Sequence, residues 1–332
     1  MHKRRFRCFA CQKSCTEPDT VCGKKRRTTK RLREALGKQA SIQPVAHVAK
    51  ASGVSHRLVQ YGFEAVAIQE IESKGLAARE DQPLRTPHFL GIDEFATRKG
   101  HRYDTIVCDL EAHQVLEVSA GRKREDVTAL LERLRDPDAV LAVSMDMSAS
   151  FRPAVQLCLP KAQIVVDHVH VIQQVMKGLK KGLSSWARKK ESKRLLDGKQ
   201  HLFLKAKEDL TEEQAKERTH LGEQLPLVET AWQRKEALRA WYATATVATA
   251  ARALDSWIEQ VQLHGPEQMR KTLSAFRNWR QEILAFFQFL PLRISNGCVE
   301  GKKNRTKALM RQAYGYRNRL HLRLRILLEH VA

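Results

Sequence analysis

Residues 89–93 read Phe-Leu-Gly-Ile-Asp and residues 140–146 read Val-Leu-Ala-Val-Ser-Met-Asp, so two short apolar runs each end in an aspartate. Apolar runs of this length are typical of strands buried in a sheet. A carboxylate at the end of such a strand lies at the rim of the sheet, where a divalent metal ion offsets the cost of removing the charge from water. A single aspartate there often only caps a turn. The pair, Asp93 and Asp146, predicts a metal site.

The sequence around these two strands predicts a mixed α/β sheet. Pro83 and Pro87 lie in a linker, which indicates a domain boundary near residue 85. We expect a hairpin of strands over residues 103–110 and 114–118, helices over 126–134 and 151–159, and a fifth strand over 164–166.

A long helical block is expected after this sheet. No proline occurs between Pro160 and Pro226, and residues with high helix propensity dominate to about residue 290. The block contains five tryptophans, which are more often core anchors than platforms for stacked bases. They are Trp186, Trp232, Trp241, Trp257 and Trp279.

A further helix is predicted after Ser295 or Asn296, and Glu300 is the acidic residue of its first turns. Helical spacing places four polar or basic residues on the same face: Lys303, Asn304, Lys307 and Arg311. A surface ion pair would not need this excess of cations. We therefore interpret Glu300 as a functional carboxylate. Three carboxylates hold two divalent ions in many enzymes that cut phosphodiesters, and the flanking cations would bind the DNA backbone.

The N-terminal part predicts a helix-turn-helix. Residues 49–55 read Ala-Lys-Ala-Ser-Gly-Val-Ser, with Gly53 suited to the turn and Ser55 suited to capping the second helix. The residues expected to face a major groove are His56, Arg57, Gln60 and Tyr61. A helical hairpin without DNA contacts has the same spacing. The overall charge favours the DNA-binding interpretation.

Composition indicates a polyanionic partner. The 332 residues include 59 Lys and Arg against 37 Asp and Glu, a formal charge of +22, with a basic run Lys24-Lys25-Arg26-Arg27 near the start. The 42% hydrophobic share excludes a wholly disordered chain, and no apolar run suits a membrane span or a secretory signal. We expect a cytoplasmic location, double-stranded DNA as partner, and no ATP or other nucleotide cofactor.

Seven cysteines suit free or metal-bound thiols better than a disulfide framework. Cys8 and Cys11, with Cys15 and Cys22, lie near the N-terminus, where zinc is one possibility that needs about four ligands. We expect the isolated residues Cys108, Cys158 and Cys298 to be buried thiols.

Four motifs in order resemble the ISL-three family of insertion-sequence transposases, from about residue 4 to the end. They are Gly91-Ile92-Asp93-Glu94-Phe95 with Arg98-Lys99-Gly100, Met145-Asp146-Met147-Ser148, Val166-Asp167-His168-Val169-His170-Val171, and Asn296-Gly297-Cys298-Val299-Glu300-Gly301 through Arg311-Gln312-Ala313-Tyr314-Gly315-Tyr316-Arg317-Asn318.

The resemblance implies a ribonuclease H-like catalytic core, a helical insertion, an Asp-Asp-Glu triad of Asp93, Asp146 and Glu300, and Mg²⁺ or Mn²⁺ as cofactor. It also implies a longer zinc ribbon than this chain has, of which Cys8 and Cys11 look like the second cysteine pair. Lys303 stands where the family usually has Asn.

The role of Asp167 stays open on sequence grounds. It follows the fifth strand and is interpreted as a fourth carboxylate near the metals, a substrate-positioning group, or a hydrogen-bonding element beneath the site. His168 and His170 beside it are interpreted as positioning groups rather than zinc ligands, because no further His or Cys pair lies nearby at metal spacing.

We therefore predict a DNA transposase that binds transposon ends, cleaves phosphodiester bonds and joins the 3′-hydroxyl to target DNA, as a homo-oligomer during synapsis. The predicted domains are a zinc-ribbon-like segment (1–24), a helix-turn-helix domain (25–82), a ribonuclease H-like domain (86–170 with 293–332) and a helical insertion (171–292). The alternatives are a non-catalytic helix-turn-helix regulator and a structure-selective nuclease on the same fold.

Overall fold

The computed structural model describes residues 4–17, 20–23, 27–98, 100, 102–188, 190–290, 292, 294–313, 316 and 318–330. Several residues of the basic run and of the family motifs lie outside these ranges: Lys24, Lys25, Arg26, Lys99, Tyr314, Gly315 and Arg317.

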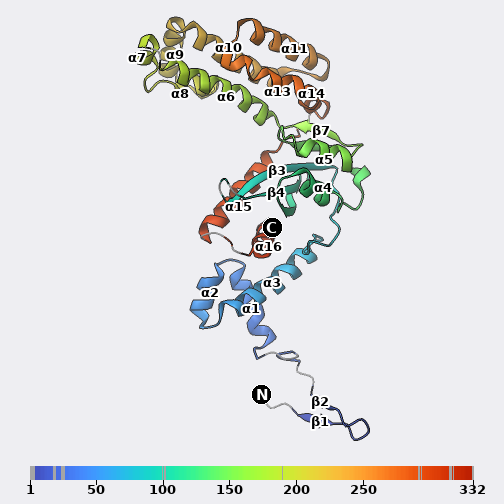
Figure 1. Cartoon of the computed structure of the whole chain (residues 1–332). Coiled ribbons are helices and arrows are strands. Elements are labelled where there is room, and N and C mark those ends of the chain that lie inside the picture. The colour runs from blue at the N-terminus through green and yellow to red at the C-terminus, as the bar shows by residue number, and fades with distance from the viewer. Residues whose placement is uncertain are drawn as a thin grey trace.

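A five-stranded mixed sheet forms the centre of the molecule, with strand order β5-β4-β3-β6-β7 (Figure 1). The strands are β3 (Phe89–Arg98), β4 (Arg102–Asp109), β5 (Gln114–Ala120), β6 (Ala142–Met145) and β7 (Gln163–Val166). β3 pairs antiparallel with β4 and parallel with β6, and β6 pairs parallel with β7. All four residues of β6 are buried, as expected for a strand covered on both faces.

The predicted end of the first strand at Ile92 is wrong. β3 continues to Arg98, because beyond the last pair with β6 it is still paired with β4, from Asp93 opposite Ile106 to Arg98 opposite Arg102. Asp93 therefore lies inside a strand, at the level where the parallel pairing ends.

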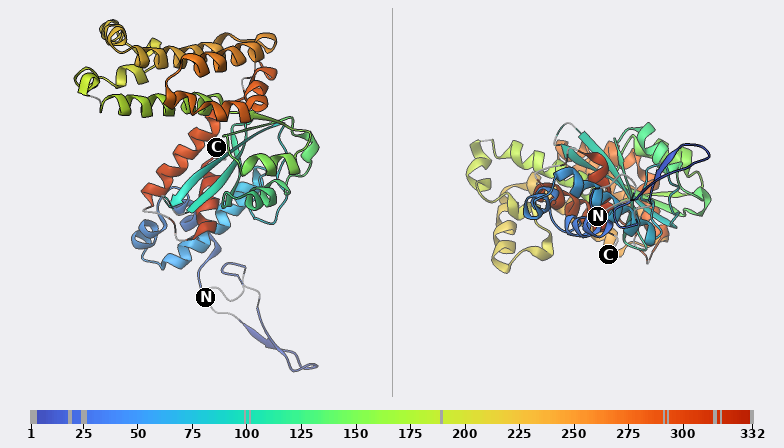
Figure 2. Two further views of the ribbon diagram at one scale, coloured as in Figure 1. Left: turned by 45° about the horizontal axis from the view of Figure 1, so that its top comes forward. Right: turned by 90° about the horizontal axis from the view of Figure 1, so that it is seen from below.

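Helices cover both faces of this sheet (Figure 2). α4 (Arg124–Leu131) and α5 (Phe151–Cys158) pack together on one face, and α15 (Gly297–Gln312) and α16 (Arg319–Glu329) pack against β3, β4 and β5. The close approach of α15 requires a glycine in β3, because a Cβ at Gly91 would lie 2.5 Å from the Val299 side chain. A mixed sheet with helices on its faces is compatible with a ribonuclease H-like core.

Three helices precede the sheet: α1 (Lys30–Ala40), α2 (Val45–Ser52) and α3 (His56–Ser73). The turn between α2 and α3 has the expected local chemistry. Gly53 adopts the left-handed conformation with φ of 63°, and the Ser55 hydroxyl accepts a hydrogen bond from the Leu58 N–H. Before them, β1 (Arg5–Arg7) and β2 (Ser14–Thr16) form an exposed antiparallel hairpin.

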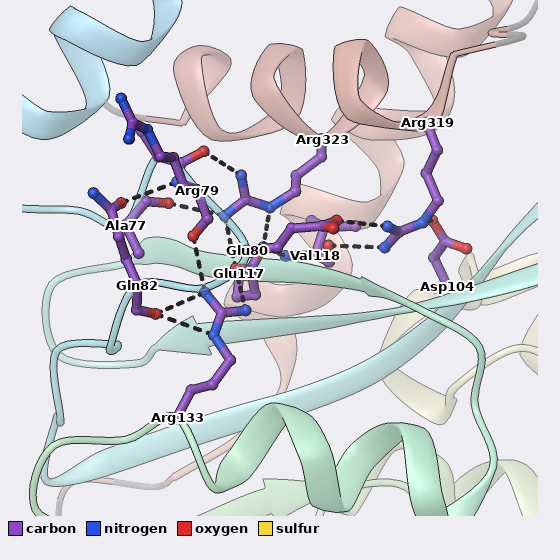
Figure 3. A network of polar contacts seen from close by, with 11 residues as sticks. Ala77, Arg79, Glu80, Gln82, Asp104, Glu117, Val118, Arg133, Arg319 and Arg323 are labelled. Carbon is purple, nitrogen blue, oxygen red and sulfur yellow. Dashed lines mark hydrogen bonds and ion pairs between the residues drawn. The ribbon is translucent and has the colours of Figure 1, made fainter.

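A buried polar network attaches the segment after α3 to the sheet and to α16 (Figure 3). The Arg323 guanidinium is fully buried, donates to both Glu117 oxygens at 2.6 and 2.7 Å, and donates to the carbonyls of Ala77 and Ala78. Arg133 contacts the same carboxylate at 2.7 Å. These contacts join three parts of the chain that are far apart in sequence.

The helical block lies beyond the β7 edge of the sheet (Figure 1). Its helices are α6 (His168–Trp186), α7 (Lys190–Leu196), α8 (His201–Leu204), α9 (Glu212–Gln224), α10 (Pro226–Thr244), α11 (Val247–His264), α12 (Glu267–Arg270), α13 (Leu273–Asn278) and α14 (Arg280–Gln288). All five tryptophans are at least 92% buried, which confirms their interpretation as core anchors.

The expected domain boundary between residues 170 and 171 falls inside α6, which runs without a break from the sheet edge into the helical block. No residue in this stretch interrupts the helix, so the sheet and the block share a rigid element. No helix among the described residues is long and apolar enough to cross a membrane.

Candidate active site

Three aspartates lie side by side at one edge of the sheet. In the parallel registers Ile92 is opposite Met145, and Met145 is opposite Val166. Asp93, Asp146 and Asp167 each follow one of these residues. Because neighbouring parallel strands end at the same edge, residues 53 and 21 positions apart in sequence are brought to one place.

Asp93 is 2% exposed, and a lysine from α15 forms an ion pair with it. Lys303 contacts one carboxylate oxygen, and the Glu94 N–H donates to the other at 2.7 Å. Burial raises the pKa of Asp93, the Lys303 ammonium opposes this rise, and the negative charge of Asp146 adds to it. Asp93 and Asp146 are thus close enough to repel each other.

Asp146 and Asp167 are linked by one imidazole. The Nδ1 atom of His170 lies 2.7 Å from Asp146 and 3.1 Å from Asp167. Burial alone would lower the pKa of His170, but its hydrogen bonds to the two carboxylates raise it to about 10. His170 is therefore a cation at neutral pH.

Asp167 is 1% exposed and occupies the N-cap position of α6. Burial alone would raise its pKa, but hydrogen bonds from His168 and His170 hold the pKa of Asp167 well below the usual range for an aspartate. The His168 ring also packs against Tyr242 and Phe286, with centroids 5.7 and 5.4 Å apart. Asp167, His168 and His170 thus join the carboxylate edge to the helical block.

Asp93 and Asp146 line a cavity of about 250 Å³, together with Glu94, Arg122, Met147, Ser148, Ser150 and Phe151. Arg122 forms a 2.8 Å ion pair with Glu94 at this cavity. Asp167 is not part of its lining. Of the three carboxylates that line the cavity, Asp93 and Asp146 are the two that sequence reasoning placed in the triad, and the third, Glu94, is paired with Arg122.

α15 is fixed against the site by Asn296 as well as by Lys303. The Asn296 side chain is buried and donates a 3.0 Å hydrogen bond to the Ile92 carbonyl, directly before Asp93. Sequence reasoning expected Ser295 or Asn296 to cap this helix. Asn296 occupies the N-cap position, but its side chain binds the neighbouring strand instead of capping the helix.

Glu300 is exposed on α15 and is not among the residues that line the cavity of Asp93 and Asp146. At 100° per residue it lies about 60° around the helix from Lys303, whose side chain reaches Asp93. The predicted basic face includes Asn304 and Arg311, which are exposed, and Lys307, which is half-buried. The structure therefore brings Asp93 and Asp146 together and leaves Glu300 on the adjacent flank of α15.

The four residues expected to read a DNA groove divide into two pairs. Arg57 and Tyr61 are exposed and contact each other, with the Arg57 Nε donating to the Tyr61 hydroxyl at 3.0 Å. His56 and Gln60 line a large cavity between α3 and α16.

The arrangement of the N-terminal cysteines does not support a zinc site. All seven cysteines are free, and Cys8, Cys11 and Cys15 are exposed. A hydrogen bond from Cys11 lowers the pKa of the Cys8 thiol, so these two side chains are close. Among the residues that the structure describes, however, no group of three or more His, Cys, Asp or Glu is arranged to hold a metal ion. Of the isolated cysteines, Cys108 is buried, while Cys158 and Cys298 are only half-buried.

The donor chemistry at the sheet edge fits Mg²⁺ or Mn²⁺. Asp93 and Asp146 line one cavity together with Glu94, and hard divalent cations take oxygen ligands. Each carboxylate has a protein cation beside it, Lys303 at Asp93 and His170 at Asp146. These contacts indicate that this edge carries negative charge that a cation must balance.

Comparison with known proteins shows the family of this chain. The family model of the ISL-three Asp-Asp-Glu transposases, described as a transposase, matches residues 90–326. The chain belongs to the ISL-three family of transposases. The "Transposase for insertion sequence element IS1001" of Bordetella parapertussis is 29% identical over 335 residues, which cover 98% of this chain and 79% of that protein. Both candidate aspartates and Glu300 lie in the matched transposase region.

Sequence reasoning on this transposase missed the contacts that hold the two aspartates. Lys303 was placed beside Glu300, but it binds Asp93. His170 was interpreted as a positioning group, but the residue that it positions was not named. In the structure it contacts Asp146. The motif around Asp167 carried a signal for the second contact, because a histidine three residues into a helix points back toward its N-terminal end. No comparable local signal predicts the contact between Lys303 and Asp93.

Proposed function

We propose that this transposase binds the ends of its transposon as double-stranded DNA, cuts a phosphodiester bond at each end and joins the freed 3′-hydroxyl to target DNA. The observation that carries the proposal is the pair of carboxylates, Asp93 and Asp146, at equal height on neighbouring parallel strands and open to one cavity.

In this proposal Asp93 and Asp146 hold the metal ions, and Glu300 completes the ligand set from the flank of α15. Bound Mg²⁺ or Mn²⁺ supplies activation of the attacking oxygen and stabilisation of the leaving oxygen. His170 orients the Asp146 carboxylate, and Asp167 orients His170 through its 3.1 Å contact. Asn296 holds the start of α15 against β3 through the Ile92 carbonyl.

The basic residues bind the DNA around this site. Lys307 and Arg311, with Asn304, extend along the flank of α15 that carries Glu300, so the backbone of the cut strand would follow this helix. Arg57 and Tyr61 project from the exposed side of α3, where they are available to a DNA groove. Synapsis of two ends requires at least two copies of the chain.

The test is a cleavage assay on a supercoiled plasmid that carries the DNA flanking this gene, with Mg²⁺ or Mn²⁺. Glu300→Gln removes one charge but preserves the side-chain shape, so end binding should stay nearly intact while cleavage is lost. Glu125→Gln, an exposed acid in α4, is the matched control and should cut like the wild type. Cleavage retained by Glu300→Gln would remove this residue from the site.

The positions of the cuts decide between the proposal and the alternatives. Metal-dependent cuts at the flanking ends support a transposase. Cuts scattered over the plasmid would identify a structure-selective nuclease instead. Tight DNA binding without any cutting would identify a regulator.

A further inference from the structure

A large cavity lies between the N-terminal helices and α16. Its volume is about 900 Å³, and its walls come from α1, α2, α3, α16, the end of β3 and the residues that follow α15. Its apolar lining is Ala40, Pro44, Val45, Ala46, Phe63 and Ala313, and its polar lining is His56, Gln60, Arg98, Tyr316, Asn318, His321 and Arg325. It is distinct from the cavity of Asp93 and Asp146, with which it shares no residue.

Three helices begin at the wall of this cavity. Val45 is the first residue of α2, His56 is the first residue of α3, and Asn318 is the N-cap of α16. The N-terminal end of a helix carries a partial positive charge and N–H groups without an intrahelical acceptor. No side chain caps α2. Side chains do cap the other two, Ser55 at α3 and Asn318 at α16, so it is the first turn of α2 that offers uncapped N–H groups to an anion.

The side chains add to this charge. Arg98, Arg325 and His56 line the cavity, and no Asp or Glu does. His321 also lines it, but this ring is paired with Glu64 from α3. A cavity with two guanidinium groups and without an acid in its lining is suited to an anionic ligand.

Arg325 is the buried cation of this cavity. Arg325 is 7% exposed, so its guanidinium is largely removed from water. Nη2 donates to the Gln43 carbonyl at 3.0 Å, but Nη1 is buried without a hydrogen-bond partner. A buried cationic donor without an acceptor is costly, and an anion in the adjoining cavity would satisfy it.

The place of the cavity indicates which anion. Arg98 lies five residues beyond Asp93 in the same strand, which corresponds to roughly 16 Å at about 3.3 Å per residue. This is about half a turn of a DNA duplex, whose turn is about 34 Å. A duplex with its scissile phosphate at Asp93 and Asp146 would thus have backbone phosphates at the distance of this cavity.

We propose that the cavity formed by Arg98, Arg325 and the first turns of α2, α3 and α16 binds a backbone phosphate of the transposon-end DNA. This inference rests on the proposed function, since it requires that the chain binds DNA. The bound phosphate contacts α3 and β3 at the same time. It thereby sets the position of the end DNA relative to the carboxylates, about half a helical turn from the cut.

The experiment combines salt-dependent binding with phosphate-ethylation interference on a duplex of the flanking DNA. Arg98→Gln removes a cavity charge, His56→Gln replaces the imidazole with a neutral amide, and Arg252→Gln, an exposed arginine of α11, is the matched control. Loss of one phosphate contact should weaken binding several-fold and reduce the slope of log K against log salt by about 1. Arg325→Lys keeps the positive charge but removes the planar guanidinium, which can donate two parallel hydrogen bonds to a phosphate. This variant should weaken binding without unfolding the chain.

Ethylation identifies the phosphate. In the wild type, ethylation of one or two phosphates about half a turn from the cut should inhibit binding. In Arg98→Gln, ethylation of the same phosphates should no longer inhibit DNA binding, while ethylation at other positions should still inhibit it. An unchanged salt slope and interference pattern in Arg98→Gln, with intact binding and cleavage by the wild type, would overturn this inference alone. A wild type that binds no DNA would overturn the proposed function.

Inorganic phosphate provides the second arm, because a free phosphate ion has the same chemistry as the DNA backbone. If phosphate raises the melting temperature of the wild type but not of Arg98→Gln, while the ethylation pattern is the same in both, the cavity binds free phosphate. That result would overturn the assignment to DNA.

Discussion

At the scale of single residues, Lys303 and His170 each place a positive charge on one of the two aspartates of the site. Lys303 is 14% exposed and Asp93 is 2% exposed at the side chain, so their ion pair is largely removed from water. Under the proposed function, a divalent ion at Asp93 would compete with this ammonium. Lys303 would then stabilise the chain without metal and oppose metal binding.

Lys303→Met tests this competition. Without divalent metal, the variant should lose about 1–3 kcal/mol of unfolding free energy, because Asp93 stays buried beside Asp146 without its cation. Added Mg²⁺ should stabilise the variant more than the wild type, since no ammonium opposes the ion. Urea denaturation with Mg²⁺ and with a chelator measures both effects, and Lys302→Met is the control. Equal stabilisation of wild type and Lys303→Met by Mg²⁺ would contradict the competition.

At the scale of elements, the contact between α15 and α16 contains a buried histidine at the end of α16. Burial lowers the pKa of His330 to about 4, with Lys302 and Arg305 from α15 acting in the same direction and Glu329 opposing them. His330 lines a surface cavity, and His113, from the turn between β4 and β5, lines the same cavity. A neutral His330 is thus part of the packed contact.

The depressed pKa predicts a loss of stability in acid. The unfolded chain binds a proton near pH 6.5 and the folded chain only near pH 4, so protons favour unfolding between these values. Stability should be complete above about pH 6.5 and should fall as the pH is lowered toward 4. His330→Gln should reduce this fall by on the order of 2 kcal/mol.

Urea unfolding of wild type and His330→Gln at several pH values measures the difference. His264→Gln, an exposed residue at the end of α11, is the control and should keep the acid dependence of the wild type. Parallel stability curves for wild type and His330→Gln would exclude His330 as the cause.

At the scale of the whole molecule, the Arg323 network joins the segment after α3 to the sheet and to α16 (Figure 3). One guanidinium binds Glu117 in β5 and the carbonyls of Ala77 and Ala78 in the linker, and Arg319 of the same helix contacts Glu80 and the Val118 carbonyl. The cavity lined by Arg98 and Arg325 also has walls from α3 and α16. The network therefore lies on the same junction as this cavity.

Arg323→Met should be strongly destabilising. It leaves two carbonyls without their donor and deprives Glu117 of one of its two arginines, which for a buried pair costs about 3–5 kcal/mol. Arg305→Met removes an exposed partner of Glu329 and should cost less than about 1 kcal/mol. Chemical denaturation followed by tryptophan fluorescence and by far-UV circular dichroism compares the two. A cost for Arg323→Met no larger than for Arg305→Met would show that the network does not hold these parts together.

Local patterns in the sequence were sufficient for most of the elements and for part of the site. Apolar runs located β3 and β6, and Gly53 and Ser55 marked the turn between α2 and α3 because left-handed backbone and N-cap chemistry depend on the residue itself. The aspartates after Ile92 and Met145 were recognised because a carboxylate that ends an apolar run is conspicuous in the sequence. The continuation of β3 to Arg98 was missed, because it depends on pairing with β4.

The partners of these residues were decided only by the tertiary structure. Lys303 is 210 positions from Asp93, and Arg323 is 206 positions from Glu117. Such pairs depend on the strand order and on the close approach of α15 to β3 at Gly91, which no helical or strand period encodes. The sequence by itself determined which residues carry charge and which elements they occupy. The tertiary structure decided which charges meet, because side chains from distant elements contact each other only after the sheet and the helices have packed.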